Sequence, residues 1–299
     1  MLDVATIRTA QAADLDQIRA LARRALIHDD DAADVVDVLW NAPTSRPELR
    51  VIAESAGRIV GVALGSLRSA TFRDGHLDLF AIEPDRHGVG IGRQLLGEVE
   101  GRLRDARVEC LLLGGNTPYF GWPGIDIRYT AALCLARSMG YRRTRLAYNM
   151  TVDLHEIRLA TAEDEERLAA EGIAVRRLRS AEIGEFDAWV RRFGGTWHIE
   201  TARAAISDPT RVHVALRGDT YAGFACHGVN RRAWFGPMGT DSSERGRGIG
   251  TVLLRRCLAD MRTDGLAIAD IGWVDPYEFY SRTVGASLAK VYWIFEKAI

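Results

Sequence analysis

The chain has 299 residues, and its 39 lysines and arginines nearly balance its 40 aspartates and glutamates, which leaves a formal net charge of −1 at pH 7. Hydrophobic residues make up 47% and charged residues 26%, proportions typical of a globular protein of about two domains. No basic block predicts nucleic-acid binding, no apolar run approaches the roughly 18 residues of a membrane span, and the chain start has no signal architecture, so we expect a cytoplasmic protein.

The first elements follow one another without long gaps. A short strand pattern ends at Arg8, and an amphipathic helix pattern follows with Asp14 as its N-cap. The acidic run from His28 to Asp31 is either a solvated face or a rim that attracts a cationic substrate. An alternating hairpin then turns near Ala56-Gly57.

The rest of the first half contains a glycine-rich stretch between a strand and a helix. The strand "LDLFAIEP" leads into "DRHGVGIGR", and a helix is predicted over 93–104. A buried strand, "VECLLLGGN", a short helix that reaches Gly140 and a closing strand, "RLAYNMTVDL", complete this half. The segment "TPYFGWPGIDIRYT" precedes the short helix, and its aromatic residues predict either a substrate pocket or a lid over the core.

The second half repeats this order. A strand over 173–178, a helix capped by Ser180, a hairpin turning at Gly218-Asp219, the strand "AWFGPMGT", a helix over 251–263 and the closing strand "LAKVYWIFEK" all have counterparts in the first half. The repeat predicts two domains, 1–154 and 173–299, joined by a charged linker over 155–172 that suits a helix. The order β-α-β-β-β-α-β-α-β predicts an α/β fold of the α+β mixed-sheet type with helices on both faces.

Both glycine stretches are suited to binding an anion. A glycine-rich turn that opens a helix presents several unpaired backbone N–H groups, and the helix dipole adds positive potential there. A dinucleotide fingerprint would need glycine where Thr251 and Arg93 stand, and neither copy has the Lys-Ser/Thr ending of a nucleotide triphosphate loop. A glycine turn without a ligand is disfavoured because the stretch occurs twice in the same context.

The second stretch, "RGRGIG" at 245–250, resembles the Q/R-x-x-G-x-G/A acyl-CoA loop of the GNAT superfamily of N-acyltransferases. The order of elements in both halves is similar to that fold, so the chain resembles a tandem GNAT protein. The resemblance implies acetyl-CoA (coenzyme A), with its pyrophosphate on the loop amides and its pantetheine arm on the preceding strand. The implied cofactor-binding residues are Met238, Gly239, Thr240, Arg245, Gly246, Arg247, Gly248, Ile249, Gly250 and Thr251 in the second copy, and Ile82, Gly88, Val89, Gly90, Gly92 and Arg93 in the first.

The resemblance also favours the second copy as the catalytic one. Family members often protonate the departing thiolate from a tyrosine ahead of the glycine that ends the short helix, and Tyr280 precedes Gly285 in this way, although it could instead be a packing residue. In the first copy Leu135 holds that position and His87 replaces the loop's Arg/Gln, so we expect it to be degenerate. An active first copy that uses an acid from its insert is the alternative.

The proton acceptor is harder to place. His227, at the end of the second hairpin, is the candidate general base, with a structural histidine, Asp275 or water as alternatives. We expect no metal.

The expected function is acetyl-CoA-dependent N-acetylation of a small molecule's primary amine by direct attack in a ternary complex, because no Cys or Ser lies in a nucleophile motif. The alternatives are acetylation of a protein or peptide amine, and an acyl-CoA-binding regulatory module with little catalysis. We expect no nucleic-acid or membrane partner, and a monomer with an internal pseudo-dimer or a homodimer. Cys134 and Cys257, among apolar residues at helical spacing, are expected to be buried free thiols.

Overall fold

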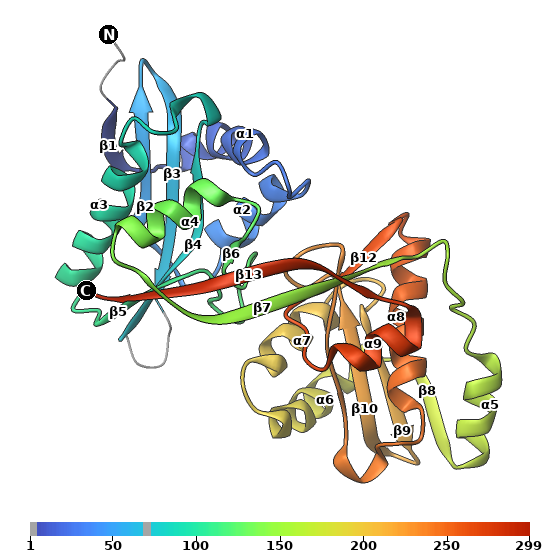
Figure 1. Cartoon of the computed structure of the whole chain (residues 1–299). Helices are drawn as coiled ribbons and strands as arrows, with labels where there is room; N and C mark the ends of the chain where they lie inside the picture. Colours follow the sequence, from blue (N-terminus) through green and yellow to red (C-terminus); the bar gives the residue numbers. More distant parts are fainter. Residues whose placement is uncertain (1–4, 68–72) are drawn as a thin grey trace. The chain divides into compact units, whose positions relative to one another are not determined.

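The computed structural model describes residues 5–67 and 73–299 (Figure 1). Its contacts divide the chain into two compact units. Unit 1 consists of residues 1–147 and 290–299, and unit 2 of residues 148–289.

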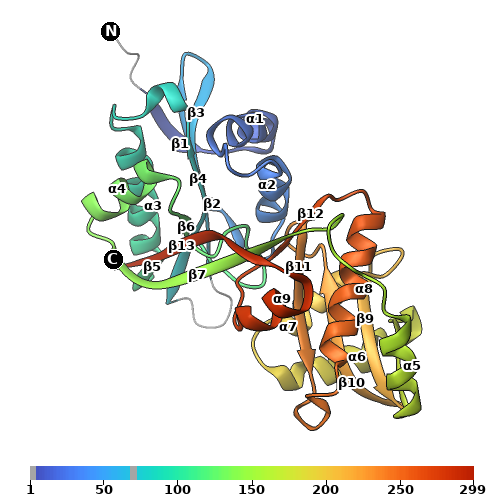
Figure 2. The same cartoon turned by 45° about the vertical axis from the view of Figure 1, so that its right-hand side comes forward.

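Unit 1 is a mixed sheet covered by helices on both faces. Its elements in chain order are β1 (Thr6–Thr9), α1 (Leu15–Ala25), α2 (Ala32–Trp40), β2 (Ser45–Ser55), β3 (Arg58–Leu67), β4 (Asp74–Ile82), α3 (Ile91–Asp105), β5 (Cys110–Leu113), β6 (Ile125–Asp126), α4 (Thr130–Ser138), the first part of β7 (Arg142–Asp153) and most of β13 (Ser287–Ala298). The strands lie in the order β1-β2-β3-β4-β5-β13-β7, and β4 and β5 pair in parallel. Both views show α3 and α4 on one face and α1 and α2 on the other (Figures 1 and 2).

Unit 2 repeats this plan. Its elements are the second part of β7, α5 (Ala162–Ala170), β8 (Ile173–Arg177), α6 (Ile183–Val190), α7 (Trp197–Ala205), β9 (Val212–Arg217), β10 (Thr220–His227), β11 (Trp234–Thr240), α8 (Ile249–Thr263), β12 (Ile268–Ile271) and α9 (Tyr277–Val284). The strand order is β7-β12-β11-β10-β9-β8, with β11 and β12 in parallel. Helix α8 packs on one face, while α6 and α7 enclose an aromatic core on the other.

The units do not divide where the sequence repeat suggested. Residues 290–299 pair with β5 inside unit 1, whereas residues 150–153 of β7 pair with β12 inside unit 2. Each closing strand therefore contributes residues to both units. The segment 155–172, expected as a linker, contains α5, which packs on β8 and α8 within unit 2.

Two helices are additional to the expected order. Helices α2 and α7 follow the first helix of each unit, and α2 buries an amphipathic stripe that includes Ala32, Val36 and Leu39. Both hairpin turns lie where they were predicted, between β2 and β3 and between β9 and β10. Across the part of the chain that the structure describes, no helix is long and apolar enough to cross a membrane.

Candidate functional site

The two glycine loops have nearly the same backbone. Gly88 and Gly246 have φ angles of +79° and +81°, and Gly90 and Gly248, the N-caps of α3 and α8, have +93° and +85°. These left-handed conformations are open mainly to glycine, which explains why the spacing repeats. In each loop the amides of a helix N-terminus are available for an anion.

A cavity of about 780 Å³ opens beside the loop of unit 1. It extends from Gly88, Gly90 and Arg93 along β4 to the segment before α4. The loop itself is tied in place, since His87 Nε2 lies 3.2 Å from the Ile82 carbonyl and Arg93 donates to Ser138 Oγ at 3.0 Å. An elongated ligand with an anionic group at the loop would fit this shape.

Asp78 lies at a bulge in the middle of β4 and lines the cavity. Leu64 of β3 pairs with Leu79 and Gly65 pairs with Leu77, so Asp78 has no partner in the ladder. Its side chain is 7% exposed, and within the described residues its Oδ1 has no hydrogen-bond partner. Burial raises the pKa of this carboxyl to about 7, although a hydrogen bond from Ser66 opposes the shift. A carboxyl with that pKa can accept a proton near neutral pH.

The other carboxyl at the end of β4 is already engaged. Glu83 accepts hydrogen bonds from Nε and Nη2 of Arg24, the shortest at 2.7 Å, and this ion pair lowers the pKa of Glu83. Asp78 is therefore the better candidate for a base on this strand.

The insert that unit 2 lacks forms the far end of the cavity. Trp122, Asp126, Arg128 and Tyr129 all line it. The Tyr129 hydroxyl donates to Asp29 Oδ2 at 2.8 Å, and burial together with this carboxylate raises the pKa of the phenol. The acidic run is therefore not simply a solvated face, because Asp29 is buried and anchors the insert.

Unit 2 differs at the position of Asp78. When the two units are aligned on the N-cap glycines Gly90 and Gly248, Gly236 of β11 corresponds to Asp78. The next residue, Pro237, corresponds to Leu79. Gly236 carries no carboxyl, and Pro237 has no backbone N–H to donate. Within unit 2, this stretch of β11 therefore has no carboxyl at the bulge and no backbone donor at the position of Leu79.

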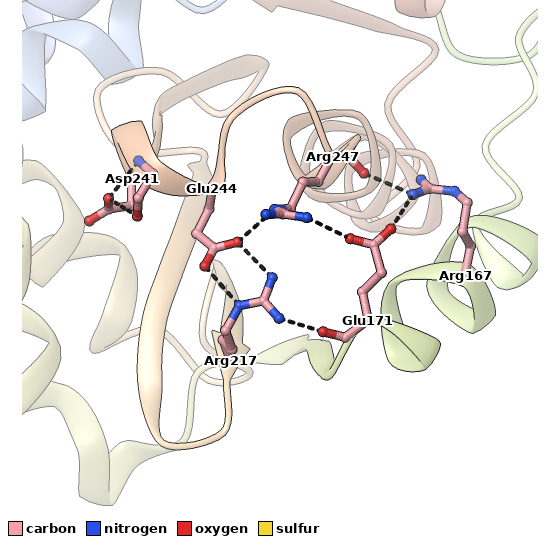
Figure 3. A network of polar contacts seen from close by, with 7 residues as sticks. Arg167, Glu171, Arg217, Asp241, Glu244 and Arg247 are labelled. Carbon is pink, nitrogen blue, oxygen red and sulfur yellow. Dashed lines mark hydrogen bonds and ion pairs between the residues drawn. The ribbon is translucent and has the colours of Figure 1, made fainter.

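The loop of unit 2 is held by a network of ion pairs (Figure 3). Arg247 lies 3.0 Å from Glu171 and 3.1 Å from Glu244, and Glu244 also pairs with Arg217 at 2.8 Å. Arg167 donates to the backbone carbonyl of Arg247 at 3.0 Å. The network pairs the Arg247 guanidinium with two carboxylates, so this cation is already engaged rather than free to pair with an anionic ligand.

Side chains of unit 2 also close over the start of α8. Atoms of Met238 and Phe279 lie 3.3 and 3.4 Å from the place that a Cβ on Gly250 would take. Tyr280 packs with its ring centroid 5.0 Å from Phe279 and 6.1 Å from Phe235, and burial raises its pKa to about 12. The Tyr280 ring is thus packed among aromatic side chains, and its role as the proton donor stays a prediction.

His227 lies near the far end of α8. Its Nε2 is 3.6 Å from Oδ2 of Asp260, which also pairs with His213 at 2.7 Å. Asp260 follows Gly250 by ten residues, which corresponds to roughly 15 Å along a helix. The structure thus places His227 and the loop at opposite ends of α8.

The remaining predicted residues lie in or beside the two loops. Ile82 ends β4, Val89 is exposed, and Gly92 begins α3 under Leu135. In unit 2, Gly239 packs beneath Phe193, and the Thr240 carbonyl accepts from Arg245 Nε at 3.4 Å. Ile249 is buried, and Gly250 and Thr251 form the first turn of α8.

Two features of unit 1 were not predicted. Cys134 was expected to be buried, but it is exposed and lines the cavity, because α4 turns Leu133 and Ala136 toward the core instead. Asp78 was missed because the search for a base was confined to the second copy. Its signal was a carboxyl within the otherwise apolar strand "LDLFAIEP".

The comparisons with known proteins agree with the repeat. The family model described as "Acetyltransferase (GNAT) family" matches residues 15–118 and 175–282. No curated protein matches the sequence significantly.

Solved structures match over nearly the whole chain. A glucosamine N-acetyltransferase region of a fungal multi-domain β-N-acetylglucosaminidase has a TM-score of 0.80 and 20% identity over 99% of this chain, which spans 38% of that protein. A GCN5-related N-acetyltransferase from Sphaerobacter thermophilus has a TM-score of 0.71 and 18% identity, with 98% and 95% of the two chains covered. A tandem GNAT protein from the clavulanic acid biosynthesis pathway has a TM-score of 0.67 and 17% identity, and the match covers 99% of this chain and 97% of that protein. At these identities the matches show a shared fold.

Proposed function

Because the chain belongs to the GNAT family of acetyltransferases, we propose that it transfers an acetyl group from acetyl-CoA to the primary amine of a small molecule, and that the reaction takes place in the cavity of unit 1. One observation carries this choice of unit: the cavity joins a loop suited to pyrophosphate with a buried carboxyl that has an unpaired oxygen. The second copy, favoured by its loop sequence, offers neither Asp78 nor the insert.

The residues of unit 1 fit acetyl-CoA in kind. The amides from Gly88 to Gly92 and the N-terminus of α3 would hold its pyrophosphate, and β4 up to Ile82 would run beside its pantetheine arm. When bound, acetyl-CoA supplies an acetyl group activated as a thioester. The backbone N–H that Leu79 keeps, and Pro237 lacks, is the donor we assign to the thioester oxygen.

Asp78 would act as the general base. A primary amine is mostly protonated at neutral pH and attacks only after losing that proton. Asp78, with a pKa of about 7, accepts the proton and so prepares the amine for direct attack. The carboxyl then releases the proton to solvent before the next turnover.

The acceptor end of the cavity favours a compact amine. Trp122 and Tyr129 provide aromatic walls, and Asp126 is neutralised by Arg128 at 2.6 Å. Amino sugars are one class to test, because a fungal protein region with this fold is a glucosamine N-acetyltransferase. Amino acids, aminoglycosides and short peptides complete the panel, and preference for peptides would favour the protein-acetylating alternative.

The decisive experiment measures thiol release from acetyl-CoA with this panel. Asp78→Asn should reduce kcat/KM by about 100-fold or more, the range expected for loss of a general base. Glu200→Gln is the matched control, because Glu200 is a buried carboxyl of unit 2 whose pKa burial also raises to about 7. Full activity of Asp78→Asn together with inactivity of Tyr280→Phe would transfer the reaction to unit 2.

A further inference from the structure

The segment after β5 of unit 1 places a buried amide near Asp78. Asn116 follows β5 and is fully buried, and its Nδ2 donates to Oγ of Ser66 on β3. Ser66 is 1% exposed and in turn donates its hydroxyl hydrogen to the Asp78 carboxylate. A hydroxyl has a single hydrogen, so by accepting from Asn116 Ser66 is left to donate to Asp78.

The fold does not require these groups. In unit 1, Ser66 pairs with His76 across the ladder. The corresponding pair in unit 2 is Gly228 and Trp234, in which the Gly228 N–H donates to the Trp234 carbonyl at 2.8 Å. Glycine thus replaces Ser66 without loss of the strand pairing. Unit 2 has Gly236 in place of Asp78, and, counted from the matching strands β5 and β12, it has Val274 in place of Asn116. All three members of the chain of hydrogen bonds are thus missing from a unit that builds the same strands.

We infer that Ser66 and Asn116 are positioning residues, which form a hydrogen-bond relay that orients the Asp78 carboxylate. This inference rests on the proposed function, in which Asp78 is the base. Buried carboxylates are strongly disfavoured without a donor, and a donor that is itself polarised by a second group is more effective. The relay also links the base to the insert that shapes the acceptor end of the cavity.

Other ionisable groups surround Asp78 and must be distinguished from it. His76 lies on the same strand, with its Nδ1 donating to the Gly114 carbonyl at 2.9 Å. His28, His87, Asp126, Arg128 and Tyr129 share the cavity, together with the arginines of the loop. A pH profile alone could therefore report another group, so the carboxyl of Asp78 has to be observed directly.

The test follows the Asp78 carboxyl by carbon NMR of protein labelled at its aspartate carboxyls, with the signal assigned by its loss in Asp78→Asn. Ser66→Ala should raise the midpoint of this titration by about one pH unit, and Asn116→Ala should raise it by less, because Ser66 remains but loses its orientation. The acid limb of kcat/KM should move to higher pH by the same amounts, while the KM for acetyl-CoA stays unchanged.

The outcomes separate the two proposals. If the titration midpoint is unchanged in folded Ser66→Ala and Asn116→Ala, the relay is refuted even if the enzyme is active. If the midpoint moves as expected but the wild-type protein turns over no amine, the relay stands and the proposed function fails. Thr44→Ala, which removes another buried hydroxyl of unit 1, controls for general loosening and should leave the midpoint in place.

Discussion

At the scale of single residues, Asp78 couples the proposed activity to stability. Its pKa is raised from the ordinary 3.8 to about 7, so between these values the folded chain keeps a proton that the unfolded chain has lost. The contribution of Asp78 to the free energy of unfolding therefore declines as the pH rises from about 4 toward 7, because the folded chain must keep or lose this proton in a buried position. Such a cost suits a site at which ionisation is needed for function rather than for folding.

Asp78→Asn should consequently be more stable than the wild type above pH 7, by up to about 4 kcal/mol, with the difference vanishing near pH 4. Chemical denaturation at pH 5 and pH 8 measures this. Glu83→Gln provides the opposite sign, because its ion pair with Arg24 lowers the pKa of Glu83 and contributes stability that is lost as pH falls. Equal pH dependence in wild type and Asp78→Asn would contradict the buried position of the carboxyl.

Cys134 tests the direct-attack mechanism. It is the exposed cysteine of α4 and lines the cavity, so a covalent acetyl-cysteine route would have to use it. Under direct attack, Cys134→Ser should keep kcat within about twofold, and rapid mixing should show no thiol burst. A burst in the wild type that disappears in Cys134→Ser would replace the ternary-complex mechanism by a two-step one.

At the scale of elements, the two loops show that a conserved backbone need not mean a conserved site. Their glycines have matching φ angles, yet α5 and its C-cap supply Arg167 and Glu171 to the loop of unit 2, and α9 supplies Phe279. In unit 1, Leu135 lies 3.1 Å from the place that a Cβ on Gly92 would take, and a cavity opens beside the loop. The two loops therefore differ in the side chains that surround them rather than in their backbone.

This contrast predicts one acetyl-CoA per chain in calorimetric titration. Gly90→Val should abolish that binding, because a branched side chain is incompatible with its φ of +93° and would cover the amides. The double variant Glu171→Gln/Glu244→Gln should add a weak second site for inorganic pyrophosphate, since it removes two carboxylates beside Arg247. Two equal sites in the wild type would show that the ion pairs are no obstacle.

At the scale of the whole molecule, local features were predictable from the sequence and non-local ones were not. Glycine spacing predicts positive φ angles because the backbone constraint on such a turn acts within a few residues. The hairpin turns at Gly57 and Gly218 were predictable for the same reason. Arg247 pairs with Glu171, which lies 76 residues away in the sequence, and no local sequence pattern encodes such a pairing. The burial that gives Asp78 its pKa likewise arises only from tertiary packing.

The closing strands follow the same rule. Periodicity predicted both β7 and β13, but a strand's own residues do not state which neighbour it will pair with. The sequence therefore assigned "LAKVYWIFEK" to the second copy, whereas Phe295 pairs with Leu113 and is packed in the core of unit 1 beside α3 and β5. Unit 1 thus depends on residues that lie at the other end of the chain from its loop.

This dependence gives a prediction that follows from the strand exchange alone. Phe295→Ala should destabilise unit 1 by about 3–5 kcal/mol, the usual cost of emptying a buried aromatic site. Hydrogen exchange should then become faster in α3 but stay unchanged in α8, although α8 is the nearer of the two in sequence. Phe224→Ala, at a fully buried site of unit 2, should give the reverse pattern. If Phe295→Ala instead accelerates exchange in α8 and leaves exchange in α3 unchanged, the last strand belongs with the second copy.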